Sequence, residues 1–87
     1  MISEKVTILN ETGLHARPAS VFVNTAAKFK SELTLSKGEK LVNAKSILSV
    51  LGLGISKGTE ITIAGDGPDE EQAVKTLVEL ITLGINE

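Results

Sequence analysis

Residues 32–42 read ELTLSKGEKLV, and this stretch indicates the class of fold. Leu33 and Leu35 alternate with polar residues, as expected of a strand with one buried face. Lys37-Gly38-Glu39 then supplies a turn, and Leu41-Val42 returns in the opposite direction. The stretch therefore predicts a β-hairpin, and hairpin pairing favours an antiparallel sheet over a buried parallel one.

Two further strands are predicted outside the hairpin. Residues 2–9 alternate apolar and polar side chains, which predicts a half-buried strand that is closed by the polar loop 10–13. Residues 61–64, with the sequence ITIA, alternate in the same way and predict the fourth strand.

Three helices are predicted between and after these strands. The first carries apolar residues at the spacing of one helical stripe: Ala19, Phe22, Val23 and Ala26. We place its start between Ala16 and Pro18, because a proline suits a first helical turn. Ser46 opens a short apolar segment, residues 47–51, which predicts about two helical turns with a short strand as the alternative.

The last helix is predicted from Asp69, on an apolar stripe formed by Ala73, Val74, Leu77, Leu80 and Ile81. Asp69 and Gln72 have the spacing of a capping box, and Gly84 suits a C-terminal stop. The acidic residues at its start complement the positive end of the helix dipole and do not match the spacing of a calcium loop: Asp66, Asp69, Glu70 and Glu71.

The predicted order is strand, helix, strand, strand, helix, strand, helix. Four strands with one apolar face need a cover, which the amphipathic helices supply, so residues 1–87 are expected to form a single α+β domain of two layers. The other face of the sheet is expected to be wet.

Composition excludes several classes of function. The chain has 87 residues, nine basic against eleven acidic side chains and two aromatic residues, which argues against nucleic-acid binding. The absence of cysteine removes disulfides and thiolate chemistry, and neither a metal site nor a cofactor is expected. With no signal peptide pattern and no apolar run of about 20 residues, we expect a cytoplasmic protein without membrane insertion.

The hexapeptide Gly13-Leu14-His15-Ala16-Arg17-Pro18 contains the only histidine and lies at the start of the first helix. Backbone N–H groups of a first turn lack intrahelical acceptors, and the helix dipole places positive charge there. This environment disfavours the imidazolium ion, so we expect a lowered pKa and a neutral, nucleophilic His15. The N–H groups of Ala16 and Arg17 and the Arg17 guanidinium can then bind a phosphoryl group on the ring.

A self-sufficient kinase or ATPase is not predicted. The sequence has no phosphate-binding loop of the G-x-x-x-x-G-K-[ST] type and no carboxylate array for magnesium. A lone nucleophile in an open loop suits a protein that accepts a phosphoryl group from one enzyme and delivers it to another.

Over essentially its whole length, the chain resembles the HPr family, the histidine-containing phosphocarriers of the bacterial phosphoenolpyruvate-dependent sugar phosphotransferase system. Residues 13–19, GLHARPA, resemble the active-site signature, and residues 43–47, NAKSI, with Leu53-Gly54 resemble a second signature. The resemblance implies an open-faced β-sandwich in which three helices cover one face of four antiparallel strands.

The resemblance also implies a mechanism and partners. Enzyme I, charged by phosphoenolpyruvate, would pass its phosphoryl group to Nδ1 of His15, which would pass it to the A domain of a sugar permease. Arg17 matches the position that steadies the phosphoryl group, and Thr12 is close enough in sequence to offer an auxiliary hydroxyl. The carrier is expected to be a monomer with no independent turnover.

Ser46 has two interpretations. The first is an N-cap of the short helix. The second, implied by the resemblance, is phosphorylation by an HPr kinase/phosphorylase, after which the protein acts with a catabolite-control transcription regulator. A phosphate there would weaken docking by charge repulsion.

From their periodicity, Ile47, Leu48, Leu51 and Leu53 are expected to divide between the core and an exposed apolar patch. We expect partners to dock on Ile47, Leu48, Leu51 and Gly54. Many family members carry methionine at positions 48 and 51, so partner preference stays open. Two alternative functions are a nitrogen-type regulatory carrier and a non-catalytic co-repressor that acts through phosphorylated Ser46. The presence of His15 argues against the co-repressor.

Overall fold

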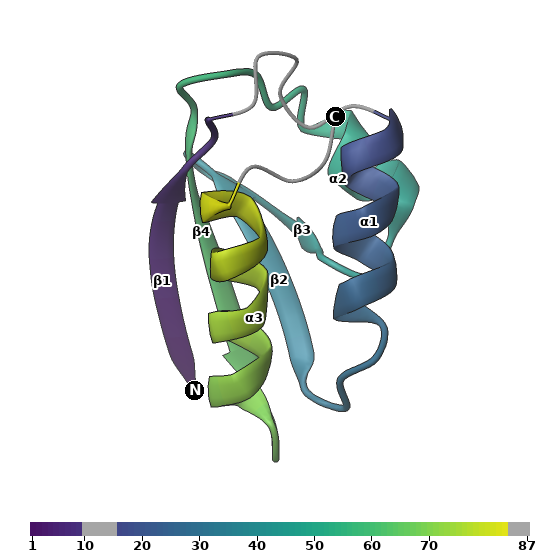
Figure 1. Ribbon diagram of the computed structural model, residues 1–87, viewed down its shortest axis with the longest axis vertical. Helices are drawn as coiled ribbons and strands as arrows, with labels where there is room; N and C mark the ends of the chain where they lie inside the picture. The colour runs from purple at the N-terminus through teal and green to yellow at the C-terminus, as the bar shows by residue number, and fades with distance from the viewer. Residues whose placement is uncertain (10–15, 84–87) are drawn as a thin grey trace.

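The computed structural model describes residues 1–9 and 16–83. Seven elements follow one another in the predicted order (Figure 1): β1 (Ile2–Thr7), α1 (Ala16–Ala26), β2 (Glu32–Lys37), β3 (Lys40–Asn43), α2 (Ile47–Gly52), β4 (Glu60–Asp66) and α3 (Glu70–Thr82). The short segment after Ser46 is a helix, so the alternative of a strand is wrong.

The four strands form one antiparallel sheet in the order β1-β4-β2-β3. The three helices lie together on one face of this sheet (Figure 1). In the hairpin, Lys37 pairs with Lys40, and Gly38 between them has a φ of 61°, a conformation that glycine adopts without a steric penalty. The predicted α+β fold, its antiparallel sheet and its one-sided helical cover are confirmed.

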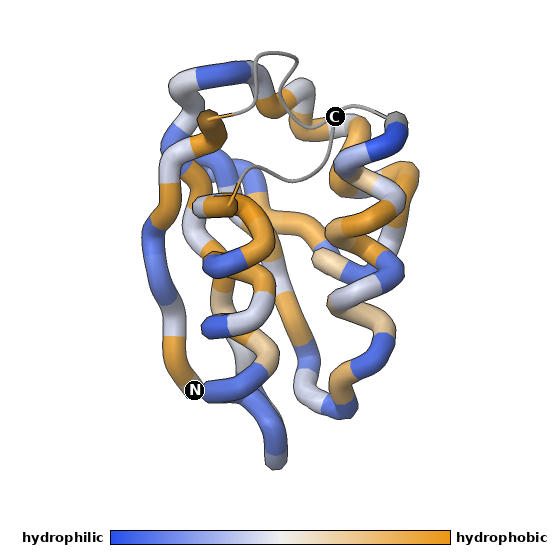
Figure 2. Tube along the Cα trace, viewed as in Figure 1, coloured by the Kyte–Doolittle hydropathy of each residue, from blue (hydrophilic) through white to orange (hydrophobic). Residues whose placement is uncertain are grey.

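The core lies between the sheet and the helices. Along β2 and β4, alternate side chains point toward the helices and are buried, as in Leu35 and Ile63, whose side chains are fully inaccessible. The largest fully buried side chain is that of Phe22 in α1. Apolar segments of the sheet and helices therefore face one another (Figure 2), and their burial is the main contribution to folding.

The structure differs from the prediction at the end of the first strand and in the burial of one apolar residue of α3. The first strand ends at Thr7 rather than at residue 9, although Ile8 is buried and its N–H donates to the carbonyl of Thr59 at 2.9 Å. In α3 the stripe is buried at four positions, whereas Leu80 is only half-buried. Gly84 lies outside the described residues.

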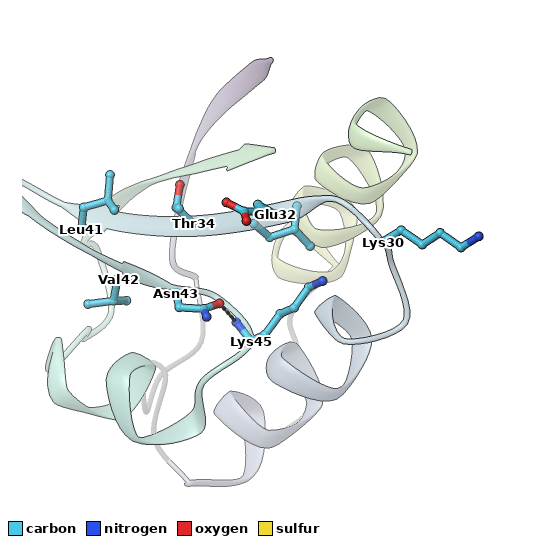
Figure 3. Close-up of a pocket in the computed structure, with 8 residues that line it drawn as sticks. Lys30, Glu32, Thr34, Leu41, Val42, Asn43 and Lys45 are labelled. Carbon is cyan, nitrogen blue, oxygen red and sulfur yellow. Dashed lines mark hydrogen bonds between the residues drawn. The ribbon is translucent and has the colours of Figure 1, made fainter. Parts of the chain in front are cut away.

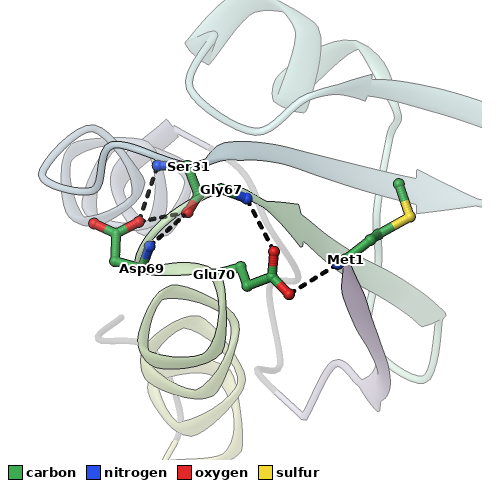
Figure 4. Close-up of polar contacts among 5 residues, drawn as sticks. All are labelled: Met1, Ser31, Gly67, Asp69 and Glu70. Atoms are coloured by element: carbon green, nitrogen blue, oxygen red, sulfur yellow. Dashed lines mark hydrogen bonds and ion pairs between the residues drawn. The ribbon is translucent and has the colours of Figure 1, made fainter.

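The predicted capping box of α3 is wrong. Asp69 occupies the N-cap position but makes no side-chain capping bond. Its carboxylate accepts instead from the backbone N–H groups of Lys30 and Ser31, each at 2.9 Å, and from the Ser31 hydroxyl at 2.5 Å (Figure 4). Donors from the loop between α1 and β2 thus replace the helix's own N–H groups, which only the tertiary fold brings within reach.

Glu70 forms a second tie at the same end of α3. One carboxylate oxygen accepts from the N–H of Gly67 at 3.0 Å, and the other pairs with the α-amino group of Met1 at 2.9 Å (Figure 4). These contacts lower the pKa of Glu70 and raise the pKa of the amine, chiefly through the hydrogen bond between the two groups. Glu70 therefore connects the start of β1 to the start of α3.

Candidate functional site

The start of α1 is where the sequence predicts a phosphoryl site. The helix begins at Ala16, within the predicted range, so Pro18 is its third residue. A proline is tolerated here because a first-turn N–H has no intrahelical acceptor to lose. Pro18 is buried, whereas Arg17 is exposed. His15 and Thr12 lie outside the described residues.

Arg17 is the described side chain with the clearest phosphate-binding chemistry. Its guanidinium is permanently charged and presents a planar set of donors that fits phosphate oxygens. Arg17 is exposed on the first turn of α1, where backbone N–H groups have no intrahelical acceptors. The helix start and the exposed Arg17 side chain therefore lie at the same end of α1.

The second predicted segment, α2, lies against α1 (Figure 1). Ser46 is its N-cap, with extended backbone angles, and its Oγ accepts from the N–H of Ser49 at 3.3 Å. The capping interpretation of Ser46 is thus confirmed. Upstream, the Lys45 N–H donates to Oδ1 of Asn43 at 2.8 Å, which closes the turn between β3 and α2.

Side chains of α2 and of its C-cap residue Leu53 divide between the core and the surface, as their periodicity predicts. Val50 and Leu53 are buried, and Leu48 is 79% exposed. We use the term α2 surface for the four positions at which docking is predicted, namely Ile47, Leu48, Leu51 and Gly54. Ile47 and Leu51 are half-buried, so both retain accessible apolar area beside Leu48.

Sequence reasoning missed Lys37. Its ammonium donates to the carbonyl oxygens of Leu53 at 3.0 Å and Gly54 at 3.3 Å, immediately after the end of α2. Lys37 is 16 and 17 residues away from these carbonyls along the chain, and no local motif signals a contact at that separation. Only the position of β2 beside the end of α2 reveals it.

One groove lies apart from α1 and α2. A groove along β2 and β3 is lined by Lys30, Glu32, Leu33, Thr34, Leu41, Val42, Asn43 and Lys45 (Figure 3). None of these residues belongs to α1 or α2. Within residues 1–9 and 16–83, no three histidine, cysteine or carboxylate side chains are arranged to hold a metal ion. No helix in these ranges is long and apolar enough to cross a membrane.

Comparison with known proteins places this geometry in context. A family model described as the PTS HPr component phosphorylation site matches residues 2–82. The chain is 47% identical to HPr-C-His from Thermoanaerobacter tengcongensis, with a TM-score of 0.96 over 100% of this chain and 98% of that one. It is 38% identical to the phosphocarrier protein HPr of Bacillus anthracis, with a TM-score of 0.89 over 92% and 95% of the two chains.

A third similar structure is the catabolite repression protein Crh of Bacillus subtilis, which was crystallised as a dimer with a swapped domain. The two sequences are 40% identical, and the structures match with a TM-score of 0.77 over 100% of both chains.

Proposed function

This chain belongs to the PTS HPr family, and from that premise we propose that it carries a phosphoryl group on His15 between enzyme I and the A domains of sugar permeases. The observation that supports the proposal most is the start of α1 at Ala16, directly after His15 in sequence. A histidine followed by a helical first turn has anion-binding N–H groups beside it in the chain.

The transfer step needs no external base. The lone pair on Nδ1 of neutral His15 attacks phosphorus while the proton stays on Nε2. A nitrogen–phosphorus bond forms, the bond to the donor group of enzyme I breaks, and its electron pair leaves with enzyme I. The second transfer reverses these roles, with the A domain supplying the nucleophile. Because the phosphoryl group is passed on in every cycle and His15 returns to its unphosphorylated state, the protein acts as a carrier, and no cofactor takes part in the proposed steps.

In this proposal Arg17 stabilises the phosphoryl group and Thr12 is an auxiliary donor. The Arg17 guanidinium is exposed in the first turn and needs no burial to act, because the phosphoryl group must remain accessible to two partners. Charge-assisted hydrogen bonds from such a group are stronger than neutral ones.

The α2 surface is the proposed docking area for both partners. Leu48 presents apolar area on α2, which packs against α1, and we propose that a partner that covers it also excludes water from the transfer site. The proposal treats residues 1–87 as one HPr-like domain that acts as a monomer in the cytoplasm.

The decisive experiment is incubation of the protein with phosphoenolpyruvate and enzyme I, followed by intact-mass spectrometry. We expect one phosphoryl adduct that is lost in acid and absent from His15→Ala. Omission of enzyme I should abolish the adduct. An acid-labile adduct that persists in His15→Ala would refute the assignment.

Similarity to Crh favours a second, additional role through Ser46. The N-cap hydroxyl is half-buried and already bonds to a backbone N–H, so a phosphate at this oxygen would remain at a helix start that favours negative charge. Incubation with ATP and an HPr kinase should then produce an acid-stable adduct that Ser46→Ala lacks. No adduct with an active kinase would exclude this role.

A further inference from the structure

Lys37 connects the end of the β-hairpin's first strand to the end of α2. It is the last residue of β2 and is half-buried, and its ammonium reaches both the Leu53 and the Gly54 carbonyl oxygens. Because α2 ends at Gly52, the carbonyls that follow have no further helical N–H groups to accept from. A cation at this end also complements the helix dipole.

The two residues that Lys37 contacts are held to different degrees by their other interactions. Leu53 is anchored by its side chain, which is 5% exposed. Gly54 has no side chain, has a φ of 62°, and would have nothing within 4 Å of an added Cβ. Its N–H donates to the carbonyl of Leu51 at 3.1 Å, and Lys37 is the donor to its carbonyl. The orientation of the Gly54 carbonyl therefore depends on Lys37.

We propose that Lys37 is a positioning residue for partner docking. By bonding to both carbonyls it holds the Leu53–Gly54 turn, and with it the last turn of α2, in the orientation in which the α2 surface meets a partner. This inference rests on the proposed function, because the docking role of the α2 surface is part of that function. It adds a residue that lies outside both sequence signatures and acts through the backbone.

The test uses Lys37→Met, which keeps the aliphatic stem and removes the charge and the donors. Lys40→Met is the matched control: Lys40 faces Lys37 in the hairpin register, is exposed, and its side chain makes no hydrogen bond or ion pair with the described residues. Lys37→Arg restores a charged donor. Steady-state phosphoryl transfer from enzyme I is measured with each carrier variant as the varied substrate.

We expect Lys37→Met to raise the KM for the carrier by about threefold to tenfold, the size of effect expected from one net hydrogen bond, with kcat unchanged. Lys40→Met should match the wild type, and Lys37→Arg should recover most of the loss. The chemistry at His15 is intact in every variant. The inference would be overturned if Lys37→Met left the KM unchanged, whatever its kcat. It would also be overturned if Lys40→Met raised the KM by the same factor.

Two readouts separate this inference from the proposed function and from a folding defect. If the wild-type protein is not phosphorylated on His15, the proposed function fails and the docking role of Lys37 fails with it. If the wild type is phosphorylated but Lys37→Met keeps a normal KM, the inference about Lys37 is refuted and the proposed function is not. If Lys37→Met does not fold, NMR of the wild type decides: a coupling across the hydrogen bond from Lys37 Nζ to the Leu53 or Gly54 carbonyl carbon supports the inference, and its absence at low temperature refutes it.

Discussion

Asp69 and Ser31, 38 residues apart in sequence, are joined by reciprocal hydrogen bonds. The Ser31 backbone N–H and hydroxyl donate to the Asp69 carboxylate, and the Asp69 backbone N–H donates back to the Ser31 hydroxyl at 3.2 Å. Ser31 is only 1% exposed. The pair links the loop before β2 to the loop before α3, at the end of the sheet opposite the hairpin turn.

The first prediction concerns acid stability. Hydrogen bonds from Ser31 and from the Lys30 N–H lower the pKa of Asp69 from 3.8 to about 2. A carboxylate with a lowered folded-state pKa stabilises the fold above its unfolded pKa, and this contribution is lost as the pH falls through the folded pKa. Unfolding free energy measured with urea should therefore decline between about pH 4 and pH 2, with a shallower decline in Asp69→Asn.

Ser31→Ala should lower the melting temperature by a few degrees at pH 7. Its unfolding free energy should also decline less steeply than that of the wild type between about pH 4 and pH 2. A double-mutant cycle with Asp69→Asn should show strong coupling between the two positions. Additive effects of the two substitutions would show that the pair contributes nothing as a unit.

The second prediction concerns Gly67, which packs directly against Ser31. A Cβ at position 67 would lie 2.6 Å from the Cα and 2.7 Å from the Oγ of Ser31, so the backbone itself would have to move. Gly67→Ala should destabilise the protein by about 1–3 kcal/mol in chemical denaturation.

Gly52→Ala is the control for Gly67→Ala. Gly52 is the last residue of α2, and an added Cβ there would meet nothing within 4 Å. Because alanine favours the helix, this change should stabilise the protein by about 0.5–1 kcal/mol. Equal destabilisation by both substitutions would contradict the packing explanation.

The third prediction concerns Arg17 and the rate of transfer. If Arg17 stabilises the phosphoryl group as proposed, loss of that charge-assisted hydrogen bond in Arg17→Gln should slow phosphorylation by enzyme I by about 10- to 100-fold. Because Arg17 is exposed, the melting temperature should not change. Lys28→Gln removes an exposed cation just beyond the other end of α1 and should leave the rate as it is. Quench-flow measurement of the phosphorylated fraction provides the test.

The fourth prediction separates the two interpretations of Ser46. Ser46→Ala removes the acceptor for the Ser49 N–H and should cost about 0.5–2 kcal/mol of stability. Ser46→Asp keeps a capping oxygen and adds negative charge, so the fold should remain stable while binding to enzyme I weakens. Calorimetry and binding titrations on the same samples distinguish the effects. Weak binding of Ser46→Ala together with normal binding of Ser46→Asp would contradict the charge argument.

The fifth prediction tests the α2 surface with two exposed leucines. Leu48 is 79% exposed on α2, and Leu41 is 65% exposed on β3, where its register partner Ser36 also faces away from the core. Leu48→Ser should weaken binding of enzyme I and of the permease A domain, whereas Leu41→Ser should leave both unchanged. Both variants should keep the wild-type melting temperature, because neither leucine is buried. Equal weakening by the two would show that apolar area in general, rather than the α2 surface, governs docking.

Local patterns were sufficient for most of the fold. Alternation in residues 32–42 predicts the hairpin because side-chain period two can bury only one face. The two separate stripes that contain Phe22 and Leu77 predict helices for the corresponding reason at period 3.6. The start of α1, the helical state of residues 47–52 and the cap at Ser46 follow from backbone groups near in sequence, which is why their predictions are confirmed.

The contacts that the sequence could not indicate are those between residues distant in the chain. Asp69 has the local pattern of a helix cap, yet its carboxylate binds Ser31 because folding brings three donors from another loop closer than its own helix does. Lys37 contacts Leu53 and Gly54 for the same reason. The sequence by itself determined the elements, their amphipathic faces and the histidine-arginine motif. The tertiary structure decided which polar groups meet across loops, because hydrogen bonds need atoms about 3 Å apart and only the packed sheet and helices set those distances.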